Sequence, residues 1–180
     1  DLQNYEFNLG IRCLPRVRLF AGARIFNVDE KFDIYRDSMN GTVGRIGNYS
    51  TTRNELFGGQ VGVATTFWRN DFASIYGSAK VAFMDNNVEG LAKTTDVFGN
   101  EIDVNINGSE TTQLFDFELG AYTSITDRTG LKAGYRGLIA EDIAFAPDQS
   151  TTFNLFGASG DMLFSKAEWH GFFVSFEAVW

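Results

Sequence analysis

The sequence predicts an all-β protein, a transmembrane antiparallel up-and-down β-barrel, on three observations. Apolar residues recur at every second position over long runs, which is the periodicity of a strand whose two faces differ. Short turns and long polar stretches join these runs alternately. The 180 residues include 18 Phe, 19 Gly and only 2 Pro, and this composition argues against a helical bundle. The length predicts a single domain over residues 1–180.

About seven strands carry the pattern, and each matches the roughly ten residues that a tilted strand needs to cross a bilayer. In chain order the runs cover residues 5–13, 17–25, 57–68, 73–83, 115–125, 131–139 and 171–180. Short turns are predicted near Pro15, Asn70 and Asp127. The polar stretches predicted as long connections cover residues 27–53, 85–112 and 140–169. Strands can cross hydrocarbon only in a closed sheet, because their backbone groups find no other partner there.

The rhythm of the connections predicts an orientation in the bacterial outer membrane. Short turns lie on the periplasmic side of such barrels, so the last strand descends and Trp180 falls where an aromatic girdle is expected. Single-chain bacterial barrels have an even number of strands. Seven strands therefore predict at least one further strand before Asp1, which would make the chain the C-terminal part of a longer barrel.

The two faces of the predicted strands have different expected surroundings. The apolar face is predicted to contact outer-membrane lipid through Phe57, Val61, Val63, Phe67, Ile75, Val81, Phe115, Phe117, Leu119, Leu131, Tyr135, Phe172, Val174, Phe176 and Trp180. The polar face is predicted to line the interior through Glu6, Arg12, Arg18, Arg24, Gln60, Tyr76, Lys80, Asp116, Glu118, Lys132, Arg136 and Glu177. In a narrow barrel of about eight strands such charges pair and fill the interior. In a wider one they line water, and the basic excess favours small anions.

Three segments resemble a known family of pore-forming outer-membrane barrels. Residues 54–62, 131–136 and 169–177 resemble, respectively, its Gly-Gly-Gln strand start, its late ascending strand and its His-Gly closing strand. The family is typified by the Legionella major outer-membrane protein and has planctomycete relatives, and the resemblance covers about residues 54–180. It implies a porin-like protein with no catalytic residues. Members usually end in Phe, whereas this sequence ends in Trp180.

Enzyme and cofactor chemistry find little support in the sequence. The single histidine, His170, is too far along its strand from Ser175 for a hydrogen bond, and Asp116 and Glu118 are expected to form ion pairs with nearby bases. We therefore predict no enzymatic activity and no cofactor. A weak calcium loop is the exception: Asp103, Asn105 and Asn107 follow the D-x-N-x-N-G spacing, although the Glu at its twelfth position is missing. The competing interpretation is a hairpin that turns at Asn107-Gly108.

Three functions stay open at this point. The first is a porin that allows passive diffusion of small solutes. The second is a structural or adhesive anchor, whose plugged barrel displays acidic extracellular loops to a partner or a surface layer. The third is a soluble sandwich or lipocalin-like binder with its apolar face inside. The expected partners are lipid, the barrel assembly machinery acting on the C-terminal strand, and a second copy or another envelope protein. The net charge of -8 argues against nucleic acid.

Overall fold

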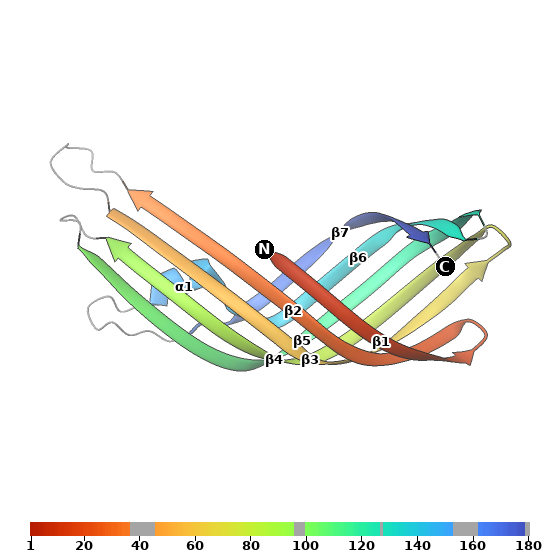
Figure 1. Ribbon diagram of the computed structural model, residues 1–180, viewed down its shortest axis with the longest axis horizontal. Helices are drawn as coiled ribbons and strands as arrows, with labels where there is room; N and C mark the ends of the chain where they lie inside the picture. The colour runs from red at the N-terminus through yellow and green to blue at the C-terminus, as the bar shows by residue number, and fades with distance from the viewer. Residues whose placement is uncertain (37–45, 96–99, 127, 153–161, 179–180) are drawn as a thin grey trace.

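The chain forms one antiparallel sheet of seven strands that follow one another in chain order (Figure 1). This computed structural model describes residues 1–36, 46–95, 100–126, 128–152 and 162–178. Its elements are β1 (Leu2–Leu14), β2 (Val17–Arg36), β3 (Ile46–Arg69), β4 (Ala73–Thr95), β5 (Glu101–Thr126), β6 (Thr129–Ile143), α1 (Ala146–Thr152) and β7 (Ser165–Ala178). In the described residues β1 and β7 do not pair with each other, so the sheet is not closed. The all-β, up-and-down prediction is thereby confirmed.

The short turns lie together at one end of the molecule, where β1–β2, β3–β4 and β5–β6 connect (Figure 1). The β3–β4 turn shows why its residues suit the position. The Asn70 side-chain oxygen accepts hydrogen bonds from the backbone N–H groups of Phe72 (3.0 Å) and Ala73 (2.7 Å). This Asx turn reverses the chain tightly.

The prediction of long loops is wrong over most of their length. β2 continues to Arg36, β3 begins at Ile46, β4 continues to Thr95 and β5 begins at Glu101. The ladder is unbroken there, with Asp29 opposite Arg53. In the third stretch, β6 continues to Ile143, and α1 and the start of β7 follow. The polar stretches also alternate with a period of two, but their apolar residues lie on the face opposite to the apolar face of the seven predicted strands.

The sheet therefore has two halves, divided where this change occurs. We call the face on which β1 and β6 side chains meet the concave face, and its opposite the convex face. The short-turn half runs from the short turns to about Ile25, Phe57, Phe83, Phe115 and Ile139. The long-connection half begins at about Phe26, Leu56, Met84, Leu114 and Ala140. Large apolar side chains are exposed on the convex face of the first half and buried on the concave face of the second.

The core lies on the concave face where the two halves join. It consists of Phe26, Val28, Leu56, Ala82, Met84, Leu114, Leu138, Ala140, Ile143 and Ala167, with Phe145 and Trp169 against it. The segment after β6 covers this layer, and α1 packs against β3, β2 and β4. Asn54 holds the segment in place: its amide donates to the carbonyl oxygen of Ala144 (2.8 Å) and accepts from its N–H (2.9 Å). No described helix is long and apolar enough to cross a membrane.

Candidate functional site: the charged concave face

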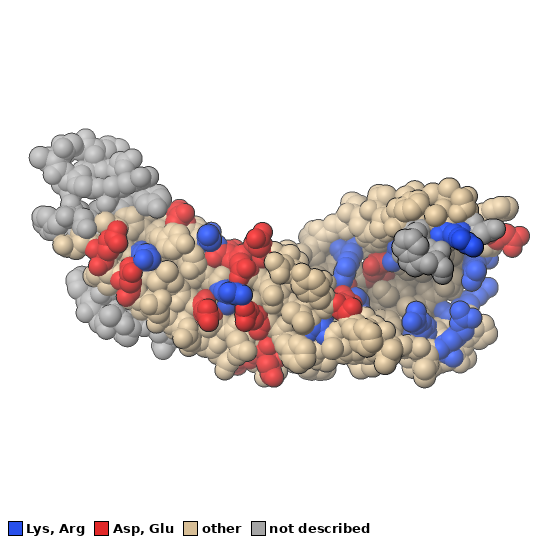
Figure 2. Space-filling model, in the orientation of Figure 1, with Lys and Arg blue, Asp and Glu red and all other residues tan. Residues whose placement is uncertain are grey.

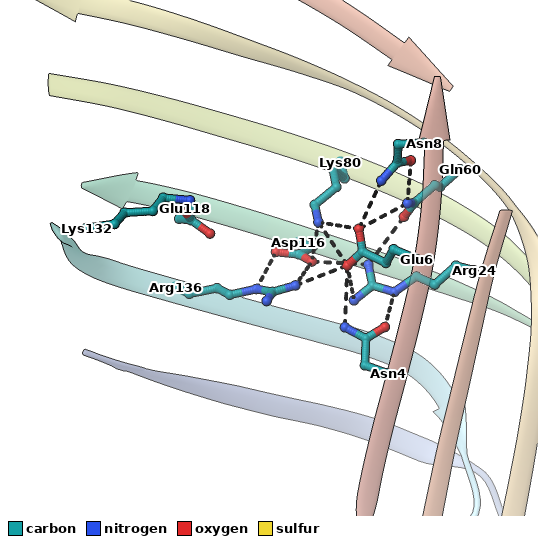
Figure 3. Close-up of polar contacts among 10 residues, drawn as sticks. All are labelled: Asn4, Glu6, Asn8, Arg24, Gln60, Lys80, Asp116, Glu118, Lys132 and Arg136. Carbon is teal, nitrogen blue, oxygen red and sulfur yellow. Dashed lines mark hydrogen bonds and ion pairs between the residues drawn. The ribbon is translucent and has the colours of Figure 1, made fainter. Parts of the chain in front are cut away.

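Five charged side chains from five strands meet on the concave face of the short-turn half (Figure 3). They are Glu6 of β1, Arg24 of β2, Lys80 of β4, Asp116 of β5 and Arg136 of β6. Lys80 Nζ lies 2.8 Å from Glu6 Oε2 and 3.1 Å from Asp116 Oδ2. Arg136 Nη2 lies 2.6 Å from Asp116 Oδ2 and 3.3 Å from Glu6 Oε1. We call this group the ion cluster.

Arg24 and Asp116 form the closed centre of the ion cluster. Arg24 Nη1 lies 3.1 Å from Asp116 Oδ2, and both side chains are 0% exposed. A buried charge is tolerated only with close partners of opposite sign, and here Asp116 contacts three bases. The partners of Arg24 and Asp116 therefore leave neither of these two groups open to water.

Amide side chains complete the ion cluster. Gln60 Nε2 donates to Glu6 Oε2 (3.1 Å) and to Asn8 Oδ1 (2.7 Å). Arg24 Nε donates to Asn4 Oδ1 at 2.9 Å. The amides on neighbouring strands thus form hydrogen bonds with charged groups of the cluster. Buried polar groups require such partners.

Alternation along each strand and the curvature of the sheet bring these residues together. Each lies at an even position, and every even position from Glu6 to Arg12 and from Arg18 to Arg24 faces the concave side. Glycine allows the close approach of strands beside the cluster. A Cβ at Gly22 would lie 1.9 Å from the backbone oxygen of Phe7, so no larger residue fits there without a shift of the backbone.

A second polar group lies closer to the short turns. Lys132 Nζ is 2.8 Å from Glu118 Oε1, and the Tyr76 hydroxyl donates to the same oxygen at 2.8 Å. Lys132 also lies over the Tyr76 ring, 4.7 Å from its centroid, in a cation–π arrangement. The sequence prediction of ion pairs for Asp116 and Glu118 agrees with both groups.

Arg12 and Arg18 lie at the short-turn end and form no ion pair with a described carboxylate, although Arg18 lines a pocket together with Glu118 and Lys132. Arg12 and Arg18 both line a pocket of about 540 Å³ together with Arg16 and Arg69. Figure 2 shows Lys and Arg side chains gathered around the hollow at that end. Of the residues predicted to face inward, only the side chain of Glu177 falls outside the described part of the structure.

The convex face holds the residues predicted to contact lipid. Twelve of them are exposed there: Phe57, Val61, Val63, Phe67, Ile75, Phe115, Phe117, Leu119, Leu131, Phe172, Val174 and Phe176. Val81 and Tyr135 are half-buried among their neighbours. Trp180 lies outside the described residues.

The segment with the calcium-like spacing is an extended strand. Asp103, Asn105 and Asn107 lie within β5, opposite Lys93, Leu91 and Glu89, so neither the predicted loop nor the alternative turn at Asn107-Gly108 forms. Alternate residues of a strand point the same way but stay separated by its rise. Asp103 instead accepts a hydrogen bond from Lys93 (2.9 Å), which raises the pKa of that lysine. The described residues contain no group of three His, Cys, Asp or Glu side chains arranged for a metal ion.

The one histidine is engaged on the convex face. His170 Nδ1 lies 2.8 Å from the Tyr135 hydroxyl, whereas Ser175 is opposite Lys132 and so faces the concave side. The two residues point to opposite faces of β7. The pairing that nucleophilic catalysis requires does not form between them.

The sequence reasoning missed several residues of the concave face. Asn8 occupies an even position of the first run, so the alternation could have revealed it, and Asn4 directly precedes that run at an even position. Arg69 could not be found in this way, because the β3–β4 register shifts between Thr66 and Trp68. The apolar layer was missed because its residues lie in or beside stretches predicted as loops.

Comparisons of this chain with protein-family models, with curated proteins and with solved structures find no match.

Proposed function

We propose that this chain forms the wall of a β-barrel in the bacterial outer membrane, with the apolar convex face of its short-turn half in contact with lipid. The exposure of that face supports the proposal. Phe7 is 66% exposed, Phe57 63% and Phe172 90%, and large exposed apolar patches are typical of surfaces that contact a membrane or another protein. The distance along β3 from Phe57 to Phe67 matches the about 9–11 residues of a membrane-crossing strand.

Aromatic side chains lie at both borders of this surface. Phe57, Phe83 and Phe115 lie beside the change to polar residues, and Trp68 and Phe72 lie at the short turns, all exposed. Aromatic residues concentrate at the two interfaces of a bilayer. A barrel also needs partners for the free edges of β1 and β7, which one or more additional strands would supply.

The soluble alternative requires the opposite arrangement. A sandwich or a lipocalin-like binder packs its apolar face inside and exposes its charges. Here Val63, Phe117 and Phe176 are exposed on the convex face, while Arg24 and Asp116 are buried on the concave face. This distribution favours the membrane barrel.

Within the barrel, we propose the role of a structural or adhesive anchor. The single observation that carries this proposal is the filled concave side: the ion cluster is closed at Arg24 and Asp116, and the apolar layer above it contains Phe26, Leu56 and Leu114 at 0–1% exposure. Filled interiors are typical of narrow barrels. The polar sheet of the long-connection half would then extend beyond the membrane and be available to a partner.

The convex face of the long-connection half is rich in acidic residues. Figure 2 shows red side chains concentrated over this part of the molecule. Exposed acids there are Asp29, Asp33, Glu55, Asp85, Glu89, Glu101 and Asp103. A partner that binds this face would therefore be basic or would bind through divalent cations, because like charges repel and complementary charges steer association.

A conductance measurement separates the anchor from the porin. We expect the chain, reconstituted in planar bilayers, to give no steady current at either voltage polarity, because the interior is filled. A channel-forming porin in the same bilayers serves as the positive control. Stable single-channel currents would reject the anchor and favour passive diffusion of small solutes.

Protease accessibility tests the membrane placement independently. In sealed vesicles with the chain inserted in one orientation, protease added on the side of the long connections should cut there. The short turns and the strands of the apolar belt should be protected. Cleavage at Arg69 and at Lys93 at equal rates would argue against the placement, because the two residues lie in different halves.

A further inference from the structure

Four arginines line the pocket at the short-turn end. Arg12, Arg16, Arg18 and Arg69 line its volume of about 540 Å³, with Tyr76 and Asn70 beside them and Asp71 as the one acidic residue of the lining. We call it the arginine pocket. Its residues come from the ends of β1, β2, β3 and β4 at the short turns and from the turns between these strands.

A β-bulge in β3 directs Arg69 into this pocket. The β3–β4 register shifts between Thr66 and Trp68, so that Trp68 is opposite Ile75 on the convex face and Arg69 is opposite Ser74 on the concave side. Without the extra residue, strict alternation would place Arg69 with Phe67 on the convex face. Bulges of this kind re-aim side chains at the rims of sheets and barrels. The β1–β2 register also shifts, between Arg12 and Leu14, at the same end.

Within the part of the chain that the structure describes, no carboxylate forms an ion pair with the arginines of this pocket. Arg12 and Arg18 are directly opposite each other on neighbouring strands, an arrangement of like charges that destabilises a sheet. Arg16 donates a hydrogen bond to the backbone oxygen of Phe67 at 3.2 Å. In the ion cluster, by contrast, each base lies within 3.1 Å of a carboxylate oxygen.

We propose that the arginine pocket binds a phosphate-type oxyanion that carries two or more negative charges. Guanidinium groups present planar pairs of N–H donors that match the oxygens of phosphate, and they keep their charge at any physiological pH. A multivalent anion between Arg12 and Arg18 would turn their mutual repulsion into two attractions. Free phosphate compounds and the phosphate headgroup of a lipid share this chemistry. The proposal does not depend on the interior being filled, nor on the role of the long-connection half.

Calorimetric titration of the purified chain tests the proposal. The chain is folded in maltoside detergent, which carries no phosphate, and is titrated with inorganic pyrophosphate at an ionic strength held constant with sodium chloride. We expect saturable binding by the wild type. The double variant Arg12→Gln/Arg18→Gln should bind at least about tenfold more weakly, because it loses two charge-assisted contacts.

Arg53→Gln is the matched control. Arg53 lies in the long-connection half, where Glu55 contacts it at 2.6 Å, so its removal should leave pyrophosphate binding unchanged. Thermal unfolding checks that the double variant folds. Without pyrophosphate it should unfold at a temperature no lower than the wild type, since a like-charge pair has been removed. Pyrophosphate should raise the unfolding temperature of the wild type and of Arg53→Gln, but not that of the double variant.

Competition with lipid identifies the source of the phosphate group. Reconstitution into phosphatidylcholine vesicles with phosphatidic acid should abolish pyrophosphate binding if a headgroup occupies the pocket. Unchanged binding in these vesicles assigns the pocket to a water-soluble anion. The proposal is overturned if the wild type shows no saturable binding in detergent, or if the double variant binds pyrophosphate as tightly as the wild type.

Discussion

The two halves of the sheet share the five strands β2 to β6 but bury opposite faces. In β3 the change occurs between Leu56, which is buried on the concave face, and Phe57, which is exposed on the convex face. In β4 it occurs between Phe83 and Met84. The backbone continues without interruption through both changes. Side chains alternate strictly between the two faces along a strand. When the apolar residues move from odd to even positions, the apolar face of the sheet therefore changes sides.

This inversion is consistent with the proposed placement, in which the two halves have different surroundings. In the long-connection half the apolar layer is covered by α1 and the segment before it, and the convex face is polar, as expected for a sheet in water. In the short-turn half the polar side chains pair with one another on the concave face, and the convex face is apolar. That second arrangement is stable where the medium outside is itself apolar.

Removing a carboxylate from the closed ion cluster should have the largest effect. Asp116→Asn leaves Arg24 buried with one counter-charge fewer, and we expect a loss of about 3–5 kcal/mol in the free energy of unfolding. Urea titration in lipid vesicles measures it. The matched variant in the other half, Asp103→Asn, breaks an exposed pair with Lys93 and should leave stability unchanged. Equal effects would show that the cluster is open to solvent.

Truncating a side chain of the apolar layer should lower the free energy of unfolding slightly less than the Asp116→Asn change does. Leu114 is 0% exposed on the concave face, and Leu114→Ala should lower the free energy of unfolding by about 2–5 kcal/mol through lost burial and a cavity. Leu119→Ala on the convex face of the same strand should cost less, because lipid fills the space left by the removed atoms. A larger loss for Leu119→Ala than for Leu114→Ala would contradict this assignment, because it would show that the tightly packed core lies on the convex face.

Adding a charge to the convex face tests its surroundings directly. Val61→Arg near the middle of the apolar belt should destabilise the folded protein in vesicles by about 2–4 kcal/mol. The same change at Asn87, on the convex face of the long-connection half, should stay within about 0.5 kcal/mol of the wild type. If both variants are neutral, the belt does not contact lipid and the proposed membrane placement fails.

The smallest expected effect concerns a polar pair within the apolar belt. Tyr135→Phe removes the hydroxyl that lies 2.8 Å from His170 Nδ1, and a loss of about 0.5–1.5 kcal/mol is expected if lipid surrounds the pair. In water the loss should be close to zero, because solvent replaces the hydroxyl. Tyr5→Phe, an exposed tyrosine of the same face, is the control. Urea titration of both variants in vesicles makes the comparison, and a loss close to zero for Tyr135→Phe would argue against lipid around the pair.

Some residues of the concave face could be predicted from the sequence, and others could not. Alternation placed Glu6, Arg24 and Lys80 on one face, and the structure brings them together. It could not show that Asp116 contacts three bases, since partners on other strands depend on register and curvature. The calcium-like spacing at Asp103 was misleading because the same residue types also suit the exposed face of a strand. Arg69 was missed because a single extra residue in β3 reverses every side chain after it.

By itself the sequence determined the seven strands, their antiparallel order, the positions of the short turns and the two chemically different faces of the short-turn half. These features are local, because a period of two and a turn residue act through neighbours along the chain. Only the tertiary structure decided that the polar stretches continue as strands, that their buried face is reversed, and that four arginines line a pocket at one end. Those outcomes depend on pairing register, bulges and what covers each face, and such relations join residues far apart in the sequence.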